Sequence, residues 1–167
     1  MSNGTSPLSV LRGVRAIIVV ILAIAFLATA AYSVMSDGSL RGMTTRITYA
    51  NRYCTTSPGT IVKTVTFYIL ASVWSTSSLH TSISSVAFSL AVDGVNLGTD
   101  HLSDSYWDPG HYARFNMTFT DPQASPVALP ATSTLVLAMT ASATAGIAAS
   151  SVTASDQAIE TFGNTSC

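Results

Sequence analysis

The feature that most constrains this chain is an uninterrupted apolar run near its N-terminus. Ala16–Val34 contains no charged residue, no proline and no glycine. As an α-helix, these nineteen residues would span about 28 Å, close to the roughly 30 Å of the hydrocarbon core of a bilayer. Membrane lipid is therefore the expected partner of Ala16–Val34, and we expect one transmembrane helix over residues 16–35.

The charges that flank this run predict its direction across a membrane. Arg12 and Arg15 stand directly before it, and Asp37 follows it. Because arginines near the end of a span are retained on the cytoplasmic side, the N-terminus is expected inside the cell. We therefore expect a cytoplasmic tail over residues 1–15, and a single-pass protein of the cell membrane whose remaining residues lie outside.

Two other interpretations of the N-terminus stay open at this point. Ala28-Thr29-Ala30 follows an apolar stretch, as a signal-peptide cleavage site does, and cleavage there would remove the anchor but leave the domain outside. Arg12-Gly13-Val14 resembles the processing site of archaeal type IV pilins. That resemblance implies a filament or envelope subunit whose helix packs against copies of itself.

The rest of the chain predicts a tether and one β-rich domain. Residues 36–45 are rich in Ser, Gly and Thr and are typical of a tether. Residues 46–167 contain several stretches of alternating apolar and polar residues with turn-forming residues between them, which is typical of a β-sandwich. A last strand pair is expected within Thr144–Phe162. The expected inward positions are Ile61, Val65, Phe67, Ile69, Ala71, Val73, Val86, Phe88, Leu90, Val92, Ala113, Phe115, Met117, Phe119, Leu135, Leu137 and Met139.

One segment of this domain resembles a known family. Ile83–Gly98 ends in Val92-Asp93-Gly94-Val95-Asn96-Leu97-Gly98, and Asp108-Pro109-Gly110 precedes a strand with Phe115, Met117 and Phe119. Over roughly Val62 to Leu137 this arrangement is similar to the late-embryogenesis-abundant type 2 (LEA type 2, or WHy) domain. The resemblance implies an all-β fold, an immunoglobulin-like or fibronectin-like antiparallel β-sandwich without catalytic residues, often behind an N-terminal membrane helix.

Composition and motifs exclude several functions. Charged residues make up 9% of the chain and the net charge is −1, so the chain has no basic field for nucleic acid. The sequence contains no G-x-S-x-G elbow, no H-E-x-x-H motif, no P-loop and no G-x-G-x-x-G turn. We therefore expect a non-enzymatic protein that needs no cofactor.

The most polar segment is residues 100–111, which we expect to be a loop. A metal-dependent enzyme could use it as a weaker alternative, since carboxylate and imidazole groups suit divalent metals; the candidate ligands are Asp100, His101, Asp104 and His111. Aromatic residues also gather in and after this segment, and aromatic side chains dominate the energetics of interfaces. The candidate interaction surface is therefore Tyr106, Trp107 and Tyr112.

Two kinds of covalent modification are expected on the outer domain. Its two cysteines, Cys54 and Cys167, lie outside any C-x-x-C motif and would pair in an oxidising compartment. Asn116 and Asn164 each begin a glycosylation sequon. The sequon at Asn3 precedes the anchor and is expected to stay unmodified.

These expectations combine into one functional interpretation. The chain is expected to be a structural or interaction module, such as an accessory subunit of a membrane complex. Its partners would be other membrane or surface proteins, or copies of itself.

Overall fold

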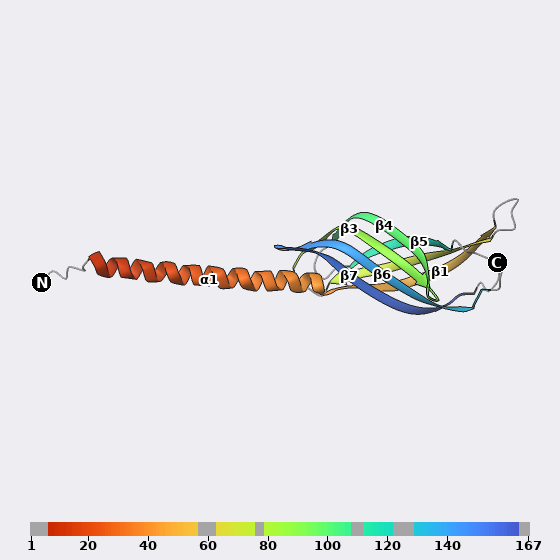
Figure 1. Ribbon diagram of the computed structural model, residues 1–167, viewed down its shortest axis with the longest axis horizontal. Helices are drawn as coiled ribbons and strands as arrows, with labels where there is room; N and C mark the ends of the chain where they lie inside the picture. Colours follow the sequence, from red (N-terminus) through yellow and green to blue (C-terminus); the bar gives the residue numbers. More distant parts are fainter. Residues whose placement is uncertain (1–6, 57–62, 76–78, 108–111, 122–128, 164–167) are drawn as a thin grey trace.

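A computed structural model describes residues 7–56, 63–75, 79–107, 112–121 and 129–163. In this part of the chain one long helix precedes seven strands, and the helix and the strand-rich body follow one another along the long axis of the molecule (Figure 1). The elements are α1 (Pro7–Arg41), β1 (Met43–Thr56), β2 (Lys63–Ser75), β3 (Thr81–Val92), β4 (Val95–Trp107), β5 (Tyr112–Asp121), β6 (Thr132–Ala145) and β7 (Ala148–Thr161).

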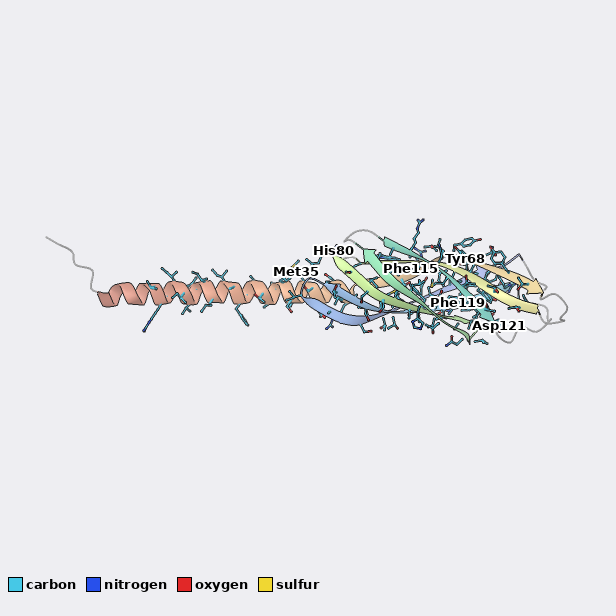
Figure 2. All side chains as sticks on the ribbon, turned by 90° about the horizontal axis from the view of Figure 1, so that it is seen from above. Met35, Tyr68, His80, Phe115, Phe119 and Asp121 are labelled. Carbon is cyan, nitrogen blue, oxygen red and sulfur yellow. The ribbon has the colours of Figure 1, made fainter. Side chains whose placement is uncertain are left out.

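Helix α1 projects away from the sandwich for most of its length. The 29 residues Gly13–Arg41 form a helix that is long and apolar enough to cross a membrane. In the part of the chain that the structure describes, 0% of the most apolar stretch of this helix is buried. Figure 2 shows the side chains along this helix pointing outward into open space. Exposed apolar side chains in such number need an apolar environment, because contact with water is unfavourable for them.

The expected tether over residues 36–45 is wrong. Residues 36–41 form the last turns of α1, only Gly42 follows, and β1 begins at Met43. Leu40 and Met43 are both buried in the sandwich core. The hydroxyl Oγ of Ser75, at the end of β2, donates a hydrogen bond of 3.1 Å to the carbonyl of Ser39. The helix is therefore fixed to the sandwich at its C-terminal end.

The seven strands form two antiparallel sheets. One has the order β1-β2-β5, and the other has the order β4-β3-β6-β7. Two-residue turns close the β3–β4 hairpin at Asp93-Gly94 and the β6–β7 hairpin at Gly146-Ile147. Asp93 and Gly94 have φ values of 51° and 85°, as tight hairpins of the Asp-Gly type require. A largely β fold with one apolar N-terminal helix is thus confirmed.

The expected strand faces are largely confirmed. Alternate residues of β2, β3, β5 and β6 are buried between the sheets, and the ring centroids of Phe88 and Phe115 lie 5.2 Å apart across the core. Ala113 is only half-buried, and Ile61 lies outside the described residues. The buried positions that the alternation predicted are Val65, Phe67, Ile69, Ala71, Val73, Val86, Phe88, Leu90, Val92, Phe115, Met117, Phe119, Leu135, Leu137 and Met139.

Three strands of the structure differ from the expectations drawn from the sequence. Met43–Thr56 forms β1, which was not expected as a strand. The expected loop over residues 100–111 is strand β4 as far as Trp107. In place of a strand pair within Thr144–Phe162, the single strand β7 pairs with β6 along its whole length.

One carboxylate ties the edges of the two sheets together. Asp156 Oδ2, on β7, accepts a hydrogen bond of 2.7 Å from the backbone N–H of Ile47 on β1. The ladder between β1 and β2 shifts register between Ile47 and Tyr49. Such a bulge takes a backbone group out of regular pairing, and Asp156 supplies an acceptor at this point.

We expect Asp156→Ala to lower the free energy of unfolding by about 1.5–3 kcal/mol, because it removes a charged acceptor and leaves a partly buried N–H group. Chemical denaturation of the full chain in detergent measures this change. Glu160→Gln is the matched control, since it removes a charge from the same strand and keeps the Ile47–Asp156 bond. Equal, small effects of the two substitutions would contradict the role given to Asp156.

Candidate functional site

The structure separates the residues proposed as metal ligands. In β4, Asp100 pairs with the buried Phe88, whereas His101 pairs with Ala87 on the outer face. Their side chains therefore point to opposite faces of the sheet. Asp104 lies further along β4, at a position whose side chain is outside the described part, and His111 lies outside it altogether. Among the described residues, no group of three or more His, Cys, Asp or Glu residues could hold a metal ion.

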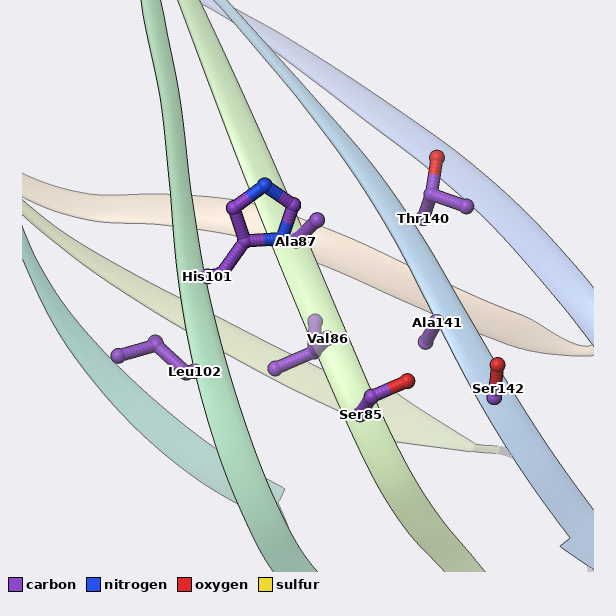
Figure 3. Close-up of a pocket in the computed structure, with 8 residues that line it drawn as sticks. All are labelled: Ser85, Val86, Ala87, His101, Leu102, Thr140, Ala141 and Ser142. Atoms are coloured by element: carbon purple, nitrogen blue, oxygen red, sulfur yellow. The ribbon is translucent and has the colours of Figure 1, made fainter.

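His101 instead borders a shallow hollow on the outer face of the four-stranded sheet. The hollow has a volume of about 390 Å³. Figure 3 shows His101 on β4, with Ser85 on β3 and Thr140 and Ser142 on β6. Neutral hydroxyl groups and one imidazole surround this space, and its floor is backbone and small side chains. The hollow offers hydrogen bonds from hydroxyl groups and from the imidazole of His101, and no described carboxylate lines it.

The proposed aromatic surface falls at the end of the sandwich from which the helix leaves. Trp107 is the last residue of β4 and pairs with Thr81, and Tyr106 pairs with Ser82. Tyr112 is the first residue of β5 and pairs with Trp74. Trp74 in turn pairs with Thr44, three residues after the helix ends at Arg41. The side chains of Tyr106, Trp107 and Tyr112 are outside the described part, so their joint surface stays a prediction.

A second aromatic cluster was missed by the sequence reasoning. Tyr49 and Tyr53 of β1 and Tyr68 of β2 share the outer side of the three-stranded sheet, and we name these three residues the tyrosine face. The rings of Tyr49 and Tyr68 meet edge to face, with centroids 6.4 Å apart. Asn51 Nδ2 donates a hydrogen bond of 3.0 Å to Tyr53 Oη. Tyr49 and Tyr53 are about half exposed, at 48% and 50%.

Positive charge accompanies the tyrosine face. Arg46 of β1 and Arg114 of β5 both pair with Ser72 of β2, so the two exposed arginines lie in one row across the sheet. Among the described residues of these strands, no Asp or Glu takes an outward position. Aromatic rings with hydroxyl tips beside arginine are the composition that interfaces favour. The signal in the sequence was the spacing of Tyr49, Asn51 and Tyr53.

The far end of the sandwich is closed around one buried cation. Arg52 is 3% exposed, and its Nη1 donates a hydrogen bond of 2.9 Å to the carbonyl of Pro130. Its guanidinium lies 4.7 Å from the centre of the Phe162 ring, within cation–π range. Burial lowers the pKa of Arg52, and the carboxylate of Asp93 opposes this effect. These contacts hold the segment before β6 and the segment after β7, and they indicate a structural role for Arg52.

The opposite end of the sandwich, near α1, is built on a close approach at Gly146. The β6–β7 hairpin packs against α1, and a Cβ added at Gly146 would lie 2.5 Å from Ser36 Oγ and 2.7 Å from Tyr32 Oη. Only a glycine allows this approach, and its φ of 56° also favours glycine. Ser36 Oγ donates a hydrogen bond of 2.8 Å to the carbonyl of Tyr32, so this buried hydroxyl is satisfied within the helix.

Cys54 lies in β1 and is disulfide-bonded in the structure. Cys167 lies outside the described residues. We expect non-reducing peptide mapping to find Cys54 joined to Cys167. Such a bond would close a loop of more than a hundred residues, worth about 4–5 kcal/mol in the chain-entropy model. Two alkylatable thiols in freshly purified native protein would contradict this pairing.

Asn116 is exposed on β5, on the same side of the sheet as the tyrosine face. Asn164 and Asn3 lie outside the described residues. We expect glycan on Asn116 or Asn164 and an unmodified Asn3, because only the outer domain would meet a glycosylation system. Intact mass against the sequence mass of 17.4 kDa, followed by glycopeptide mapping, tests this expectation. Glycan on Asn3 would contradict the orientation itself.

Comparison with known proteins shows similarity only in fold. No protein-family model matches the chain, and no curated protein matches it. Among solved structures, the Northeast Structural Genomics Consortium target SoR45 has a TM-score of 0.50 at 6% identity, over 73% of this chain and 88% of that one. The putative ApaA protein from Bordetella pertussis has a TM-score of 0.47 at 12% identity, over 74% and 95%. Spo0M, a sporulation control protein from Bacillus subtilis, has a TM-score of 0.39 at 12% identity, over 72% and 49%.

Proposed function

We propose that this chain is a non-enzymatic, single-pass membrane protein whose β-sandwich stands outside the cytoplasm as a structural or interaction module. One observation carries the proposal. A helix long and apolar enough to cross a membrane, with none of its apolar window buried, is joined to the sandwich through one residue, Gly42. The helix would be the anchor, and the fixed joint would hold the sandwich in one orientation at the membrane surface.

The strand order supports an immunoglobulin-like or fibronectin-like sandwich. If β1, β2 and β5 are taken as strands A, B and E, then β4, β3, β6 and β7 take the places of C′, C, F and G. The turn at Asp93-Gly94 lies between two paired strands, as the LEA type 2 resemblance implies. We propose membership of this class on these two grounds.

The tyrosine face is the surface we propose for a protein partner. It combines half-exposed tyrosines with the Arg46–Ser72–Arg114 row, so an acidic surface on another membrane or surface protein would complement it. A photo-crosslinking residue in place of Tyr53 is expected to capture one partner in intact membranes. The same residue in place of Thr153, on the opposite sheet, is the control. Equal capture at both positions would contradict a role for this face.

Alkaline extraction of membranes tests the anchor. The full chain is expected to stay in the membrane pellet. The double substitution Ile21→Arg with Ile24→Arg is expected to release it, because each arginine near the centre of a span costs about 2.5–3.5 kcal/mol on insertion scales. Ser33→Arg, at the outer end of the apolar run, is the control and should leave the protein in the pellet. Release of the unchanged protein would contradict the proposal.

A filament or envelope subunit is the second candidate, and the fixed joint between α1 and the sandwich favours it. Small residues in the apolar run would let helices approach closely in an assembly core; they are Ala23, Ala25, Ala28, Ala30 and Ala31. Electron microscopy of the purified full chain distinguishes the two candidates. Regular filaments would support the second, and dispersed particles would support the first.

A metal-dependent enzyme is the weaker alternative that an elemental assay can test. We expect less than stoichiometric metal in the purified full chain, because Asp100 and His101 point to opposite faces of β4. One equivalent of metal that is lost in His101→Ala or His111→Ala would contradict the non-enzymatic proposal.

A further inference from the structure

We propose that the tip of the β6–β7 hairpin is a second contact with the membrane, in which Ile147 enters the boundary between the headgroups and acyl chains of the outer leaflet. This inference rests on the proposed membrane anchor and extends it. It assigns a lipid surface as the occupant of an exposed apolar site that no other described residue covers.

The depth of the hairpin tip follows from its contact with the helix. Residues 16–36 are twenty-one consecutive uncharged residues between Arg15 and Asp37, and as a helix they span about 32 Å. That length matches a hydrocarbon core of roughly 30 Å, so the outer boundary falls near Ser36. Gly146 abuts both Tyr32 and Ser36. The hairpin tip therefore reaches the level at which the helix leaves the hydrocarbon.

The side chains at this level have the character that an interface requires. Ile147 is 61% exposed, and Tyr32, which meets the neighbouring Gly146, is also exposed. No charged residue occurs between Thr132 and Thr153, so the arms of the hairpin carry no charge that lipid would exclude. Tyr32 is an aromatic residue with a polar tip, which membrane interfaces favour. Figure 1 shows the β6–β7 hairpin running back alongside α1.

The consequence is a fixed tilt of the sandwich. A single helix can tilt in the bilayer, and a sandwich joined rigidly to it would tilt with it. A second apolar contact to one side of the helix, held by the close approach at Gly146, restricts that tilt. The tyrosine face would then be held at a constant angle to the membrane plane.

Site-directed spin labelling of the full chain in lipid nanodiscs tests this contact. The label is placed at Ile147→Cys, Ser150→Cys, Ile159→Cys or Val20→Cys, and the unsubstituted chain measures labelling of its own cysteines. Ile159 is the matched control, because it is a 71% exposed isoleucine on β7, the strand that follows the turn, but lies about 40 Å from the tip. Collision rates with oxygen, which concentrates in lipid, and with a water-soluble nickel complex report the depth of each label.

At position 147 we expect an oxygen-to-nickel ratio several-fold above that at 159, with position 150 between them. Free access of nickel to position 147 would overturn the inference, and so would exclusion of both reagents, which indicates a protein partner. Position 20 separates this failure from failure of the anchor. If nickel reaches position 20, the proposed anchor is wrong; if only oxygen reaches position 20 while nickel reaches position 147, the hairpin contact alone is wrong. Thermal unfolding of each labelled protein must match that of the unsubstituted chain.

Discussion

Replacing Phe88 by alanine is expected to lower the free energy of unfolding by about 3–5 kcal/mol. Phe88 is 0% exposed on β3, a central strand of the four-stranded sheet. Its ring meets Phe115 from the other sheet at a centroid distance of 5.2 Å. The substitution would remove this contact and leave a cavity at the middle of the core. Domains of this size are stable by only about 5–15 kcal/mol, so a large part of the stability would be lost.

Guanidinium unfolding of the full chain in detergent, followed by tryptophan fluorescence, measures this loss. Ile159→Ala is the control, because an isoleucine that is 71% exposed should contribute little to the core. Surface substitutions of this kind change stability by no more than about 0.5 kcal/mol. A cost of less than about 1 kcal/mol for Phe88→Ala would contradict the packing of the two sheets.

Replacing Gly146 by valine is expected to cost about 2–5 kcal/mol and to loosen the joint between the helix and the sandwich. Part of the cost is backbone strain, because the φ of this residue is 56°. The rest is steric, because the new side chain would overlap Tyr32 and Ser36. Gly94→Val isolates the first part, since Gly94 has a φ of 85° and nothing within 4 Å of an added Cβ.

We expect Gly146→Val to destabilise the protein by about 1–3 kcal/mol more than Gly94→Val, which is the usual cost of overpacking. Adding Tyr32→Ala to Gly146→Val removes the larger clashing side chain and should recover part of this difference. Equal costs at the two glycines, with no recovery, would show that the hairpin does not pack on the helix.

The strands that could be predicted from the sequence are those with an apolar inner face. In β2, β3, β5 and β6 the alternation of apolar and polar residues matches the buried positions. Strand β1 could not be recognised in this way, because its inward positions include Thr45 and Arg52, both buried. Strand β4 lies at a sheet edge, and inward positions such as Asp100 are only half-buried. Polar residues on both faces gave β4 the appearance of a loop.

The prediction of a tether over residues 36–45 was wrong for a different physical reason. Serine and glycine are typical of flexible linkers, but here Ser36 and Ser39 are buried, at 0% and 1% exposed. The hydroxyl of Ser36 donates a hydrogen bond of 2.8 Å to the carbonyl of Tyr32, and that of Ser39 donates one of 2.8 Å to the carbonyl of Met35. Small side chains that satisfy their own hydrogen bonds let the hairpin and the strands approach the helix closely. Composition alone does not distinguish this close packing from a flexible segment.

Only the candidate surface whose residues are close in sequence could be predicted. Tyr106, Trp107 and Tyr112 were conspicuous because they are close in sequence, whereas the tyrosine face joins Tyr49 and Tyr68 from two strands. Pairing of β1 with β2 brings these rings together, and that pairing could not be inferred while β1 was unrecognised.

Accessibility of cysteine from outside the cell tests the central claim most directly. Thr153→Cys, at an exposed position of β7, and Ser2→Cys, in the N-terminal tail, are compared in intact cells with a membrane-impermeant maleimide. Thr153→Cys is expected to react in intact cells, and Ser2→Cys is expected to react only after the membrane is permeabilised. Reaction of Ser2→Cys in intact cells, with Thr153→Cys protected, would contradict the proposed orientation.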